Sequence, residues 1–501
     1  MTTRLHCAFW WGMAKERKIN VGVIAAAGKG TRAWPRTSWI PKPLFTFENR
    51  SLLARNVALQ FEKIGVDRLY ILIGHLQEQV LEEVNLIRHQ YPGKHIETAQ
   101  WTGKGLAADV ASLQPLIQED FCLILGDEFY HQTNHDILPR MWQKRKAATA
   151  MIALLPSPLK SEIRKNYSVV ARNNRVAELV EKPENPPNNL LGLGSYVFSP
   201  AFFEFYHKTE ASRRSGVIEL TDVIQNMANH TAVYSQSLTG RYFNINSLAD
   251  YYAANYMIRA EAFDRFKISM IIPALNNEDS ISDMLHDFEP HVDEMLVIDM
   301  GSSDRTAELA RGKKVRLFQE RAPQKFFSVH YAPAIYAAMR QARGDILILC
   351  PADGSFRALD LTKILEYLKD ADMVIGTRTT RQMMEQGSNL KSGYRWLNVF
   401  FGKLVEILWW SQEPRLTDIG CLYRGIWKES FLKMANDLTA KSKVYALEMI
   451  IELMRYHMRC IEIPISFYRT YGSEQVEGFV NKWRYFWSIV GLIMRKRLGG
   501  H

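Results

Sequence analysis

A segment near the start of the chain has the residue types needed to hold phosphate. Gly28, Gly30 and Thr31 come directly after an apolar run, and the cations of Arg32 and Lys42 follow them. Glycines let the backbone approach a triphosphate closely and direct N–H groups at it, and the two cations can neutralise its charge. A glycine turn with solvated basic residues is the simpler interpretation. The fixed spacing from GKGTR to PKPL favours the phosphate site.

Acidic residues follow several other apolar runs. These residues are Asp127, Asp299, Asp304 and Asp353. A carboxylate directly after a strand can cap the next helix, or it can bind a nucleotide or the Mg²⁺ ion that accompanies one. For Asp299, Asp304 or Asp353 taken alone, the two interpretations have similar weight. For Asp127, the phosphate segment in the same part of the chain favours the metal.

The elements that must position these residues form a repeated pattern. Apolar runs of strand length alternate with amphipathic stretches over 21–28, 69–74 and 121–127, and again over 267–274, 294–304 and 344–354. Such β-α-β alternation predicts a parallel sheet covered by helices on both faces. Open sheets of this class bind ligands at the carboxyl ends of their strands. We therefore expect an α/β fold with two domains, each a mostly parallel sheet.

The two domains are expected to follow a short extension. We assign residues 1–19 to the extension, 20–264 to the first domain and 265–501 to the second. No linker rich in Pro, Gly or Ser separates the domains, so the stretch from Asp250 to Phe266 is a candidate connector. Both Met1 and Met13 are compatible with the natural start.

Length and composition limit the class of protein. The chain of 501 residues is long enough for two large α/β domains or about three of average size. With 47% hydrophobic and 23% charged residues, it is not a disordered chain. The formal charge of +10 favours polyanionic partners such as nucleotides, phosphates or anionic lipid. Nucleic acid is not expected, because no reading helix or sheet motif with interleaved aromatic residues is recognisable.

Cysteine usage and the C-terminal segment bear on location. The five cysteines are scattered without a CxxC pair, which favours a reducing, cytoplasmic setting. The segment from Phe479 to Arg497 is aromatic and basic, and its apolar stretch is about half of the roughly 20 residues that span a bilayer. It suits either a segment in the interface of an anionic membrane or a core helix with a solvated basic end. The stretch from Trp396 to Trp410 can line the same surface, which would make the membrane contact peripheral.

The motifs GKGTR, PKPL, LGD and VEKP occur in a familiar order. Over about residues 20–262 the chain resembles the sugar-1-phosphate nucleotidyltransferases, most of all the glucose-1-phosphate thymidylyltransferase branch. The resemblance implies that a sugar-1-phosphate oxygen attacks the α-phosphorus of a nucleoside triphosphate and expels pyrophosphate, by positioning and charge neutralisation. The catalytic residues that it implies are Arg32, Lys42, Asp127 and Lys182.

The same resemblance implies where substrates and metal bind. Base and sugar contacts fall on Gln100, Gly105, Glu181, Gly192 and Gly194. Asp127 is implied as a ligand of Mg²⁺ or Mn²⁺. The second ligand is open, because Asn244 stands where the family often has Asp and Asn246 is equally plausible.

Three later segments, PALNNE, DMGSSDRT and PADGS, each follow an expected strand. Over residues 267 to about 475 the chain resembles the inverting family 2 glycosyltransferases, most of all those that transfer hexoses to polyprenyl or dolichyl phosphate. Both domains are then Rossmann-like, of the GT-A type. The implied nucleotide contacts are Pro273, Glu278, Asp299 and Asp304. Asp353 is the implied catalytic metal ligand, although Pro351 replaces the first Asp of the family's DxD element.

The acceptor is open between a polyprenyl phosphate and a carbohydrate hydroxyl. The resemblance implies that Arg378 and Arg469 contact a lipid phosphate and that Asp418 lies near the acceptor as a catalytic residue. A phosphate is ionised at neutral pH and needs no strong base to attack the anomeric carbon of the sugar. A hydroxyl would need a carboxylate, for which Asp418 and Glu448 are the candidates.

We therefore expect a bifunctional enzyme of cell-surface polysaccharide synthesis. Its first domain would form an NDP-sugar from a nucleoside triphosphate and a hexose-1-phosphate, and its second would transfer a sugar to the acceptor. In the alternative, the first domain is a regulatory module that binds a nucleotide sugar. The departure at Asn244 motivates this alternative, and the set of Arg32, Lys42 and Asp127 argues against it. The base, the sugar and a homo-oligomeric state stay open.

Overall fold

The computed structural model describes most of the chain. The described residues are 17–48, 50–213, 215–319, 331–380, 383, 392–409, 415–442, 444–469 and 479–499. The expected N-terminal extension up to residue 16, with both candidate start residues, lies outside these ranges. The chain forms two units that divide between Tyr251 and Tyr252, within helix α8 (Leu248–Ala262). The expected domain boundary after residue 264 stays a prediction.

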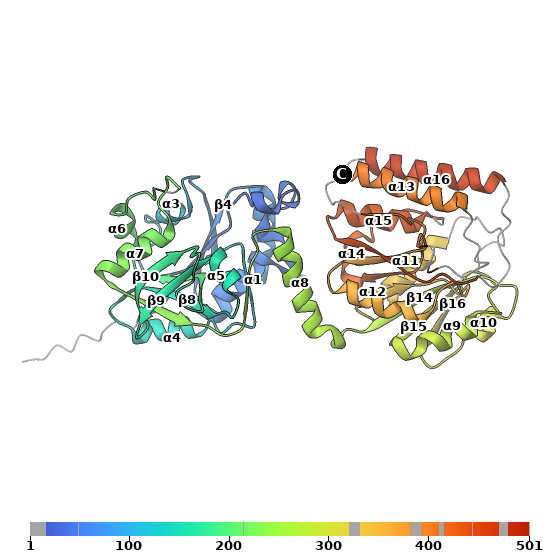
Figure 1. Ribbon diagram of the computed structural model, residues 1–501, viewed down its shortest axis with the longest axis horizontal. Helices are drawn as coiled ribbons and strands as arrows, with labels where there is room; N and C mark the ends of the chain where they lie inside the picture. Colours follow the sequence, from blue (N-terminus) through green and yellow to red (C-terminus); the bar gives the residue numbers. More distant parts are fainter. Residues whose placement is uncertain are drawn as a thin grey trace, which may run out of the picture. The chain divides into compact units, whose positions relative to one another are not determined.

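The first unit contains a mixed sheet. In its described residues nine strands lie in the order β5-β4-β1-β6-β11-β8-β12-β10-β9. Figure 1 labels β4, β8, β9 and β10 of this sheet. Strands β5, β4, β1 and β6 are parallel, whereas β11 is antiparallel to both of its neighbours. The strands are β1 (Val21–Ala25), β4 (Arg68–Ile73), β5 (His95–Gln100), β6 (Phe121–Leu125), β8 (Ala148–Pro156), β9 (Tyr167–Arg172), β10 (Arg175–Glu181), β11 (Leu190–Phe198) and β12 (Ala232–Ser237).

Two short pairs of strands lie beside this sheet. They are β7 (Glu128–His131) with β13 (Arg241–Asn244), and β2 (Thr46–Phe47) with β3 (Arg50–Ser51). The antiparallel β7–β13 pair places Asn244 opposite Glu128. Residues directly after β6 and residues near the end of the unit are therefore neighbours.

Alternate side chains of the central strands enter two cores. In β1, Val21 and Val23 pack on one face and Ile24 on the other. One core includes side chains of α1 (Leu52–Ala58), α2 (Gln77–Gln90) and α4 (Ile137–Lys144), and the other those of α3 (Leu106–Ala111), α6 (Ala201–His207) and α7 (Leu220–His230). The short helix α5 (Lys160–Lys165) precedes β9. The expected coverage of the sheet by helices on both faces is confirmed.

The second unit also contains a sheet covered by helices, but its sheet is more nearly parallel. Its described strands form a seven-stranded sheet in the order β16-β15-β14-β17-β19-β18-β20, in which only β19 is antiparallel to its neighbours. The strands are β14 (Ile268–Ala274), β15 (Glu294–Asp299), β16 (Val315–Gln319), β17 (Ile346–Leu349), β18 (Met373–Thr377), β19 (Arg424–Trp427) and β20 (Cys460–Pro464). With two such sheets, the predicted α/β class is confirmed.

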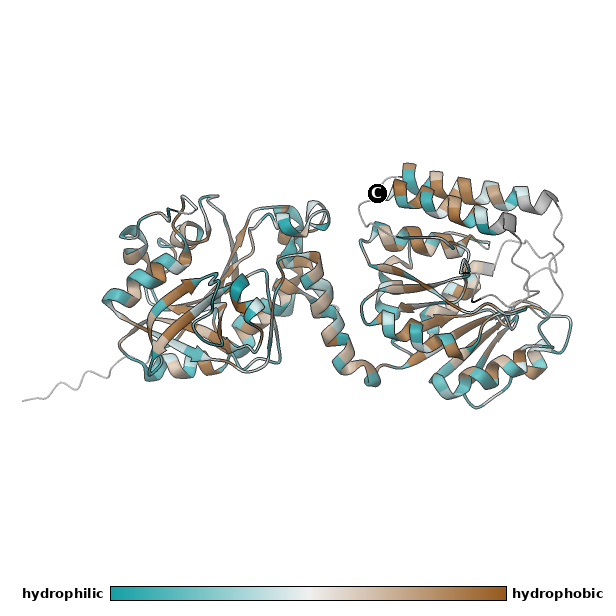
Figure 2. Cartoon of the chain, in the orientation of Figure 1, coloured by the Kyte–Doolittle hydropathy of each residue, from teal (hydrophilic) through white to brown (hydrophobic). Residues whose placement is uncertain are grey.

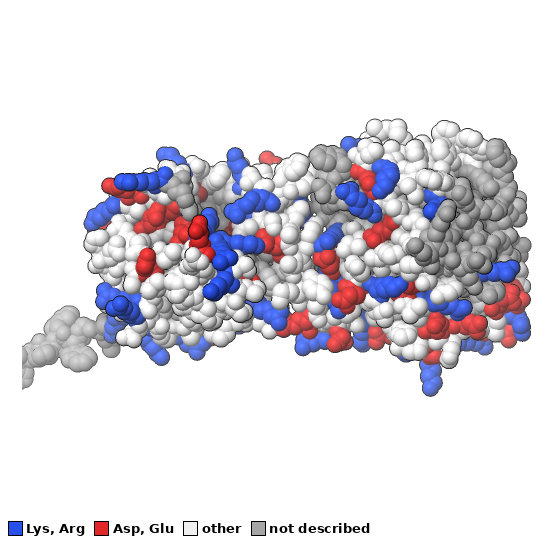
Figure 3. Space-filling model, in the orientation of Figure 1, with Lys and Arg blue, Asp and Glu red and all other residues white. Residues whose placement is uncertain are grey.

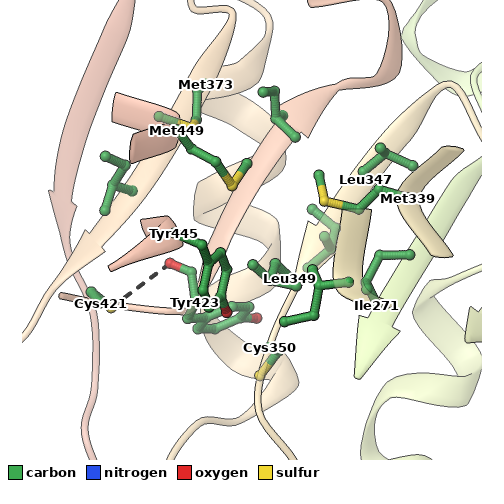
Figure 4. Close-up of a cluster of buried hydrophobic side chains, with 14 of the residues drawn as sticks. Ile271, Met339, Leu347, Leu349, Cys350, Met373, Cys421, Tyr423, Tyr445 and Met449 are labelled. Carbon is green, nitrogen blue, oxygen red and sulfur yellow. Dashed lines mark hydrogen bonds between the residues drawn. The ribbon is translucent and has the colours of Figure 1, made fainter. Parts of the chain in front are cut away.

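Helices enclose the second sheet around one large core. They are α9 (Ile281–Phe288), α10 (Thr306–Leu309), α11 (Tyr331–Gln341), α12 (Leu361–Leu368), α13 (Ser392–Leu408), α14 (Lys428–Met434), α15 (Tyr445–Arg455) and α16 (Phe479–Leu498). Hydrophobic residues concentrate in the strands and on the inward faces of the helices (Figure 2). Figure 4 shows part of this core, where the Cys421 thiol contacts the Tyr423 carbonyl over 3.9 Å. Among the described residues, no helix is both long and apolar enough to cross a membrane.

Candidate active sites

The phosphate segment turns sharply between β1 and Lys42. Gly30 has a φ of 61°, and a Cβ atom there would lie 3.0 Å from side-chain carbons of both Lys42 and Thr37. Only glycine fits this conformation without strain. Beside it, Gly28, Thr31 and Arg32 are exposed. The segment therefore offers an open stretch of backbone with a buried lysine behind it.

Asp127 follows strand β6 and lies beside that lysine. The Gly126 N–H donates to the Ala25 carbonyl over 2.9 Å, and a Cβ atom on Gly126 would lie only 2.5 Å from that oxygen. Lys42 Nζ lies 3.7 Å from Asp127 Oδ2, and their side chains are 8% and 40% exposed. Burial lowers the pKa of Lys42, and the charge of Asp127 opposes that shift. The pair thus joins a poorly solvated cation to an accessible carboxylate.

Asn244 has an oxygen that suits a metal ion. Its Nδ2 donates to Asn166 Oδ1 over 2.7 Å, which leaves Oδ1 buried without a hydrogen-bond partner among the described residues. The N–H of the next residue donates to the Asp127 carbonyl over 3.0 Å, so Asn244 and Asp127 are adjacent. A carboxylate and an amide oxygen are ligands that Mg²⁺ and Mn²⁺ accept. Asp127 and Asn244 therefore fit a site for one of these ions. The other candidate ligand, Asn246, donates its backbone N–H to the Asn244 carbonyl over 2.9 Å.

The expected sugar segment is joined to this side of the site. Lys182, at a φ of 45°, donates its backbone N–H to the Asn166 carbonyl over 2.7 Å, and its Nζ lies 3.7 Å from Glu181 Oε1. Glu181 Oε2 also accepts from Thr221 Oγ1 over 2.7 Å. Asn166 therefore connects Lys182 with Asn244, a link that no local motif indicated.

The residues expected to contact the nucleotide base lie at the carboxyl end of β5 and directly before α3. Gln100 is exposed, and its Nε2 donates to Gln77 Oε1 over 2.9 Å. Gly105 has a φ of 108° and directly precedes α3. Their roles in base recognition stay predictions.

The two glycines assigned to the sugar pocket have packing roles. A Cβ atom on Gly192 would lie 2.1 Å from the ring of Tyr167, whose hydroxyl donates to the Leu193 carbonyl over 2.7 Å. A Cβ atom on Gly194 would lie 2.6 Å from the Glu128 carboxylate, which accepts the Gly194 N–H over 2.7 Å. Strand β11 therefore needs glycine at both positions whatever the substrate contacts are.

In the second unit, hydrogen bonds join the loops that follow β14 and β15. The Asn277 N–H donates to Thr306 Oγ1 over 2.7 Å, and the Glu278 N–H donates to Asp304 Oδ2 over 3.1 Å. Although burial opposes it, the hydrogen bonds from Thr306 and Glu278 lower the pKa of Asp304. Asp299 is buried, with Oδ1 accepting the Ser302 N–H over 3.0 Å. The expected nucleotide residues thus share one loop cluster, reached from β14 through Pro273.

Asp353 lies beside the segment that ends in Arg469. Asp353 Oδ1 accepts the Ser355 N–H over 3.1 Å, and the Ser355 carbonyl accepts the Tyr468 N–H over 2.9 Å. The exposed Arg469 follows Tyr468 directly. Among the described residues, no group of three or more His, Cys, Asp or Glu side chains is arranged to hold a metal ion.

Arg378 and Asp418 form a bidentate ion pair. Arg378 Nε and Nη2 donate to the Asp418 carboxylate over 2.7 and 2.8 Å, and Asn398 Nδ2 donates to it over 3.1 Å. Asp418 is 1% exposed. Burial disfavours the charged guanidinium, but the Asp418 carboxylate outweighs this effect and raises the pKa of Arg378. Nη1 is the guanidinium nitrogen that Asp418 does not engage.

The other candidate base, Glu448, is also buried and bonded. It lies 2.9 Å from Lys496 Nζ and accepts the N–H groups of Thr439 and Ala440 over 2.9 and 2.8 Å. Although burial opposes the charged form, these donors lower the pKa of Glu448. A carboxylate held in this way is a weak base.

Comparisons with known proteins agree with the division into two units. The family model for nucleotidyl transferase matches residues 21–261, and that for glycosyl transferase family 2 matches residues 269–426. UTP–glucose-1-phosphate uridylyltransferase AglF of Haloferax volcanii is 32% identical over 205 residues, which cover 40% of this chain and 81% of the relative.

Two further similarities cover the same half. The bifunctional protein GlmU of Methanocaldococcus jannaschii is 29% identical over 235 residues, 46% of this chain and 53% of GlmU, so the chain spans about half of that relative. The crystal structure of a UDP-glucose pyrophosphorylase with UDP-glucose shows 22% identity and a TM-score of 0.43, covering 49% of this chain and 99% of that chain.

Replacing Gly192 by alanine should destabilise the first unit. Because the new methyl group would meet the Tyr167 ring at 2.1 Å, we expect a loss of about 2 kcal/mol in the free energy of unfolding. Urea denaturation measures this loss. The control is Gly28→Ala, which has open space for its methyl group among the described residues and should change the midpoint little. Equal midpoints for the two variants would contradict the packing role.

Replacing Asp418 by asparagine should lower the stability of the second unit. Removing one partner of a buried ion pair leaves the other charge uncompensated, so we expect a loss of about 3 kcal/mol in the free energy of unfolding. Urea denaturation again measures it, with the exposed Arg469→Gln as the control that should leave stability unchanged. A fully stable Asp418→Asn protein that has lost transferase activity would instead support Asp418 as a base.

Proposed function

Because residues 21–261 belong to the nucleotidyl transferase family and residues 269–426 form a family 2 glycosyl transferase domain, we propose that the chain performs two group transfers. The first unit forms an NDP-sugar from a nucleoside triphosphate and a hexose-1-phosphate. The second transfers a sugar from an NDP-sugar to a polyprenyl phosphate. The observation that carries the proposal is the Lys42–Asp127 pair beside the Asn244 amide oxygen, which has no hydrogen-bond partner in the described part of the chain.

In the first unit, positioned charges support nucleotidyl transfer. The exposed backbone of Gly28–Thr31 would hold the triphosphate, and Arg32 and Lys42 would neutralise the charge that passes to the departing pyrophosphate. Asp127 with Asn244 would hold Mg²⁺ or Mn²⁺, which supplies further charge neutralisation when bound. Lys182 would contact the sugar phosphate. No protein nucleophile is needed, because the sugar phosphate itself attacks.

In the second unit, the bonding of both candidate bases supports a phosphate acceptor. Asp418 is paired with Arg378, and Glu448 is held by Lys496. An ionised phosphate needs neither carboxylate, and Arg378 Nη1 and Arg469 would bind it. A carbohydrate hydroxyl would require one of these buried carboxylates to be released first.

A relative supports one choice of nucleotide and sugar. The Haloferax volcanii relative is named for UTP and glucose-1-phosphate, and it is 32% identical over 205 residues. We propose a uridine or thymidine triphosphate and a hexose-1-phosphate for this chain.

Single substitutions should separate the two activities. Asp127→Ala removes a metal ligand, so we expect pyrophosphate release from UTP and glucose-1-phosphate to fall at least about a hundredfold while transfer from added UDP-glucose to undecaprenyl phosphate is retained. Asp353→Ala should do the reverse. Both products are followed by chromatography with radiolabelled sugar. If folded wild-type protein releases no pyrophosphate with any nucleotide and sugar but still transfers, the first unit is a regulatory module.

Two helices of the second unit support contact with a membrane. Large apolar side chains are exposed at helical spacing on α13 at Trp396, Phe400 and Ile407, and on α16 at Trp483, Trp487, Met494 and Leu498. The helices touch where the rings of Phe401 and Phe486 pack together, with their centroids 5.4 Å apart.

The charges on these helices favour anionic lipid. Helix α16 has no acidic residue, and its basic residues include the exposed Arg484, Arg495 and Arg497. Glu406 of α13 pairs with Lys403. On the face shown in Figure 3, charges of both signs gather along the edge of this unit away from α13 and α16. Exposed apolar stripes flanked by cations are typical of interfacial helices, so we propose a peripheral site on the anionic, cytoplasmic face of a membrane.

Removing the aromatic side chains should weaken binding to vesicles. Two tryptophan side chains that enter the membrane interface contribute about 2 kcal/mol or more to the free energy of binding. The double variant Trp396→Ser, Trp487→Ser should therefore lower the partition constant between water and vesicles about tenfold or more. Sedimentation with phosphatidylglycerol-containing vesicles measures it. Trp34→Ser, which removes a 58% exposed tryptophan from the first unit, is the matched control. Equal binding of all three proteins would exclude these helices as the membrane surface.

A further inference from the structure

A buried carboxylate lies directly behind the nucleotidyl-transfer site. Glu128 follows Asp127 in the chain and is 3% exposed. It accepts the Gly194 N–H and the Tyr242 hydroxyl, each over 2.7 Å, and also the Tyr130 hydroxyl. No described lysine or arginine forms an ion pair with it. Buried carboxylates are rare without a cation, so three neutral donors in one place indicate a specific role.

The three donors come from three different elements of the site. Tyr130 lies on β7 with Glu128, Gly194 lies on β11, and Tyr242 lies on β13. Strand β13 also carries Asn244, which is opposite Glu128 in the register of the β7–β13 pair. One carboxylate therefore fixes the strand of the unpaired amide oxygen relative to the strand that starts beside Asp127.

The surroundings of Glu128 leave it little freedom. A Cβ atom at position 194 would lie 2.6 Å from the carboxylate. Only because this residue is glycine can the Glu128 side chain pack directly against β11. Behind it, the Ser195 hydroxyl donates to the Tyr130 oxygen over 2.8 Å, and His135 Nε2 lies 3.1 Å from Ser195 Oγ. A buried network whose members are bonded to one another holds a single geometry.

We propose that Glu128 is a positioning residue that sets the spacing between the Asp127 carboxylate and the Asn244 amide oxygen. It acts through the β7–β13 pair and does not touch substrate. The proposal rests on the proposed nucleotidyl transfer, because it explains how the two metal-binding oxygens of that site are held. It also gives Gly194 a reason to be glycine that is independent of the sugar.

The test is Glu128→Gln, which keeps the size of the side chain but replaces one acceptor oxygen by an NH₂ donor. The amide oxygen can keep the Gly194 N–H and one tyrosine hydroxyl, but the NH₂ group forces the other hydroxyl to turn and accept, so the network must rearrange and β13 should shift relative to Asp127. We expect Mn²⁺ binding in the presence of UTP, measured by electron paramagnetic resonance of the free ion, to weaken at least about fivefold. The Mg²⁺ concentration for half-maximal pyrophosphate release should rise by a similar factor.

Matched variants distinguish positioning from general stability. Asp120→Asn alters a carboxylate at the other end of β6, bonded to Trp142 Nε1 over 2.8 Å, and should leave Mn²⁺ binding unchanged. Tyr242→Phe should reproduce the Glu128→Gln effect, and the double variant should add little to it, because both changes break one link. If Glu128→Gln fails to fold, Tyr242→Phe carries the test alone.

The experiments distinguish failure of the Glu128 positioning role from failure of the proposed nucleotidyl transfer. A Glu128→Gln or Tyr242→Phe protein that melts earlier but binds Mn²⁺ and UTP like the wild type would overturn the positioning role. If Asp127→Ala also left Mn²⁺ binding unchanged, the metal site itself would be misassigned. Transfer from added UDP-glucose by the second unit should stay constant throughout, which restricts the effect of each variant to the first unit.

Discussion

Each unit holds a cation beside a carboxylate near the carboxyl end of its sheet, and the rest of each site is arranged around that pair. The two pairs differ in strength. Lys42 Nζ is 3.7 Å from Asp127, whose side chain is 40% exposed, whereas Arg378 makes two bonds of 2.7 and 2.8 Å to a buried Asp418. A loosely paired, poorly solvated lysine can exchange its carboxylate for a phosphate. A bidentate arginine stays in place and offers only its remaining nitrogen.

Much of this arrangement could be predicted from the sequence, because strand-end residues follow apolar runs that are easy to recognise. Asp127 and Asp353 follow β6 and β17 as expected, and the phosphate segment follows β1. The antiparallel strands in the second half of the first sheet were not foreseen, since β9 and β10 carry a mixed pattern with exposed positions. Local periodicity gives no information on pairings of that kind.

The hydrogen-bond and ion-pair partners of the site residues could not be predicted from the sequence. Arg378 and Asp418 are 40 residues apart, and Tyr242 and Glu128 are 114 apart. No periodic pattern relates such positions, and a motif names a residue without its partner. For the same reason, the motif that assigned Gly192 and Gly194 to a sugar pocket could not show that Tyr167 and Glu128 fill the space where their side chains would lie. The contact of these glycines with sugar stays a prediction.

The proposed membrane surface and the proposed acceptor are linked through one buried lysine. Lys496 of α16 reaches Glu448 and Glu452 of α15 over 2.9 and 2.7 Å, and this contact fixes which side of α16 faces inward. The opposite side then presents Trp487 and Met494 outward. Freeing Glu448 to deprotonate a hydroxyl would leave Lys496 with fewer partners in a buried place and loosen the helix. A phosphate acceptor requires no such release, so the contact that orients the proposed membrane surface also favours an acceptor found in membranes.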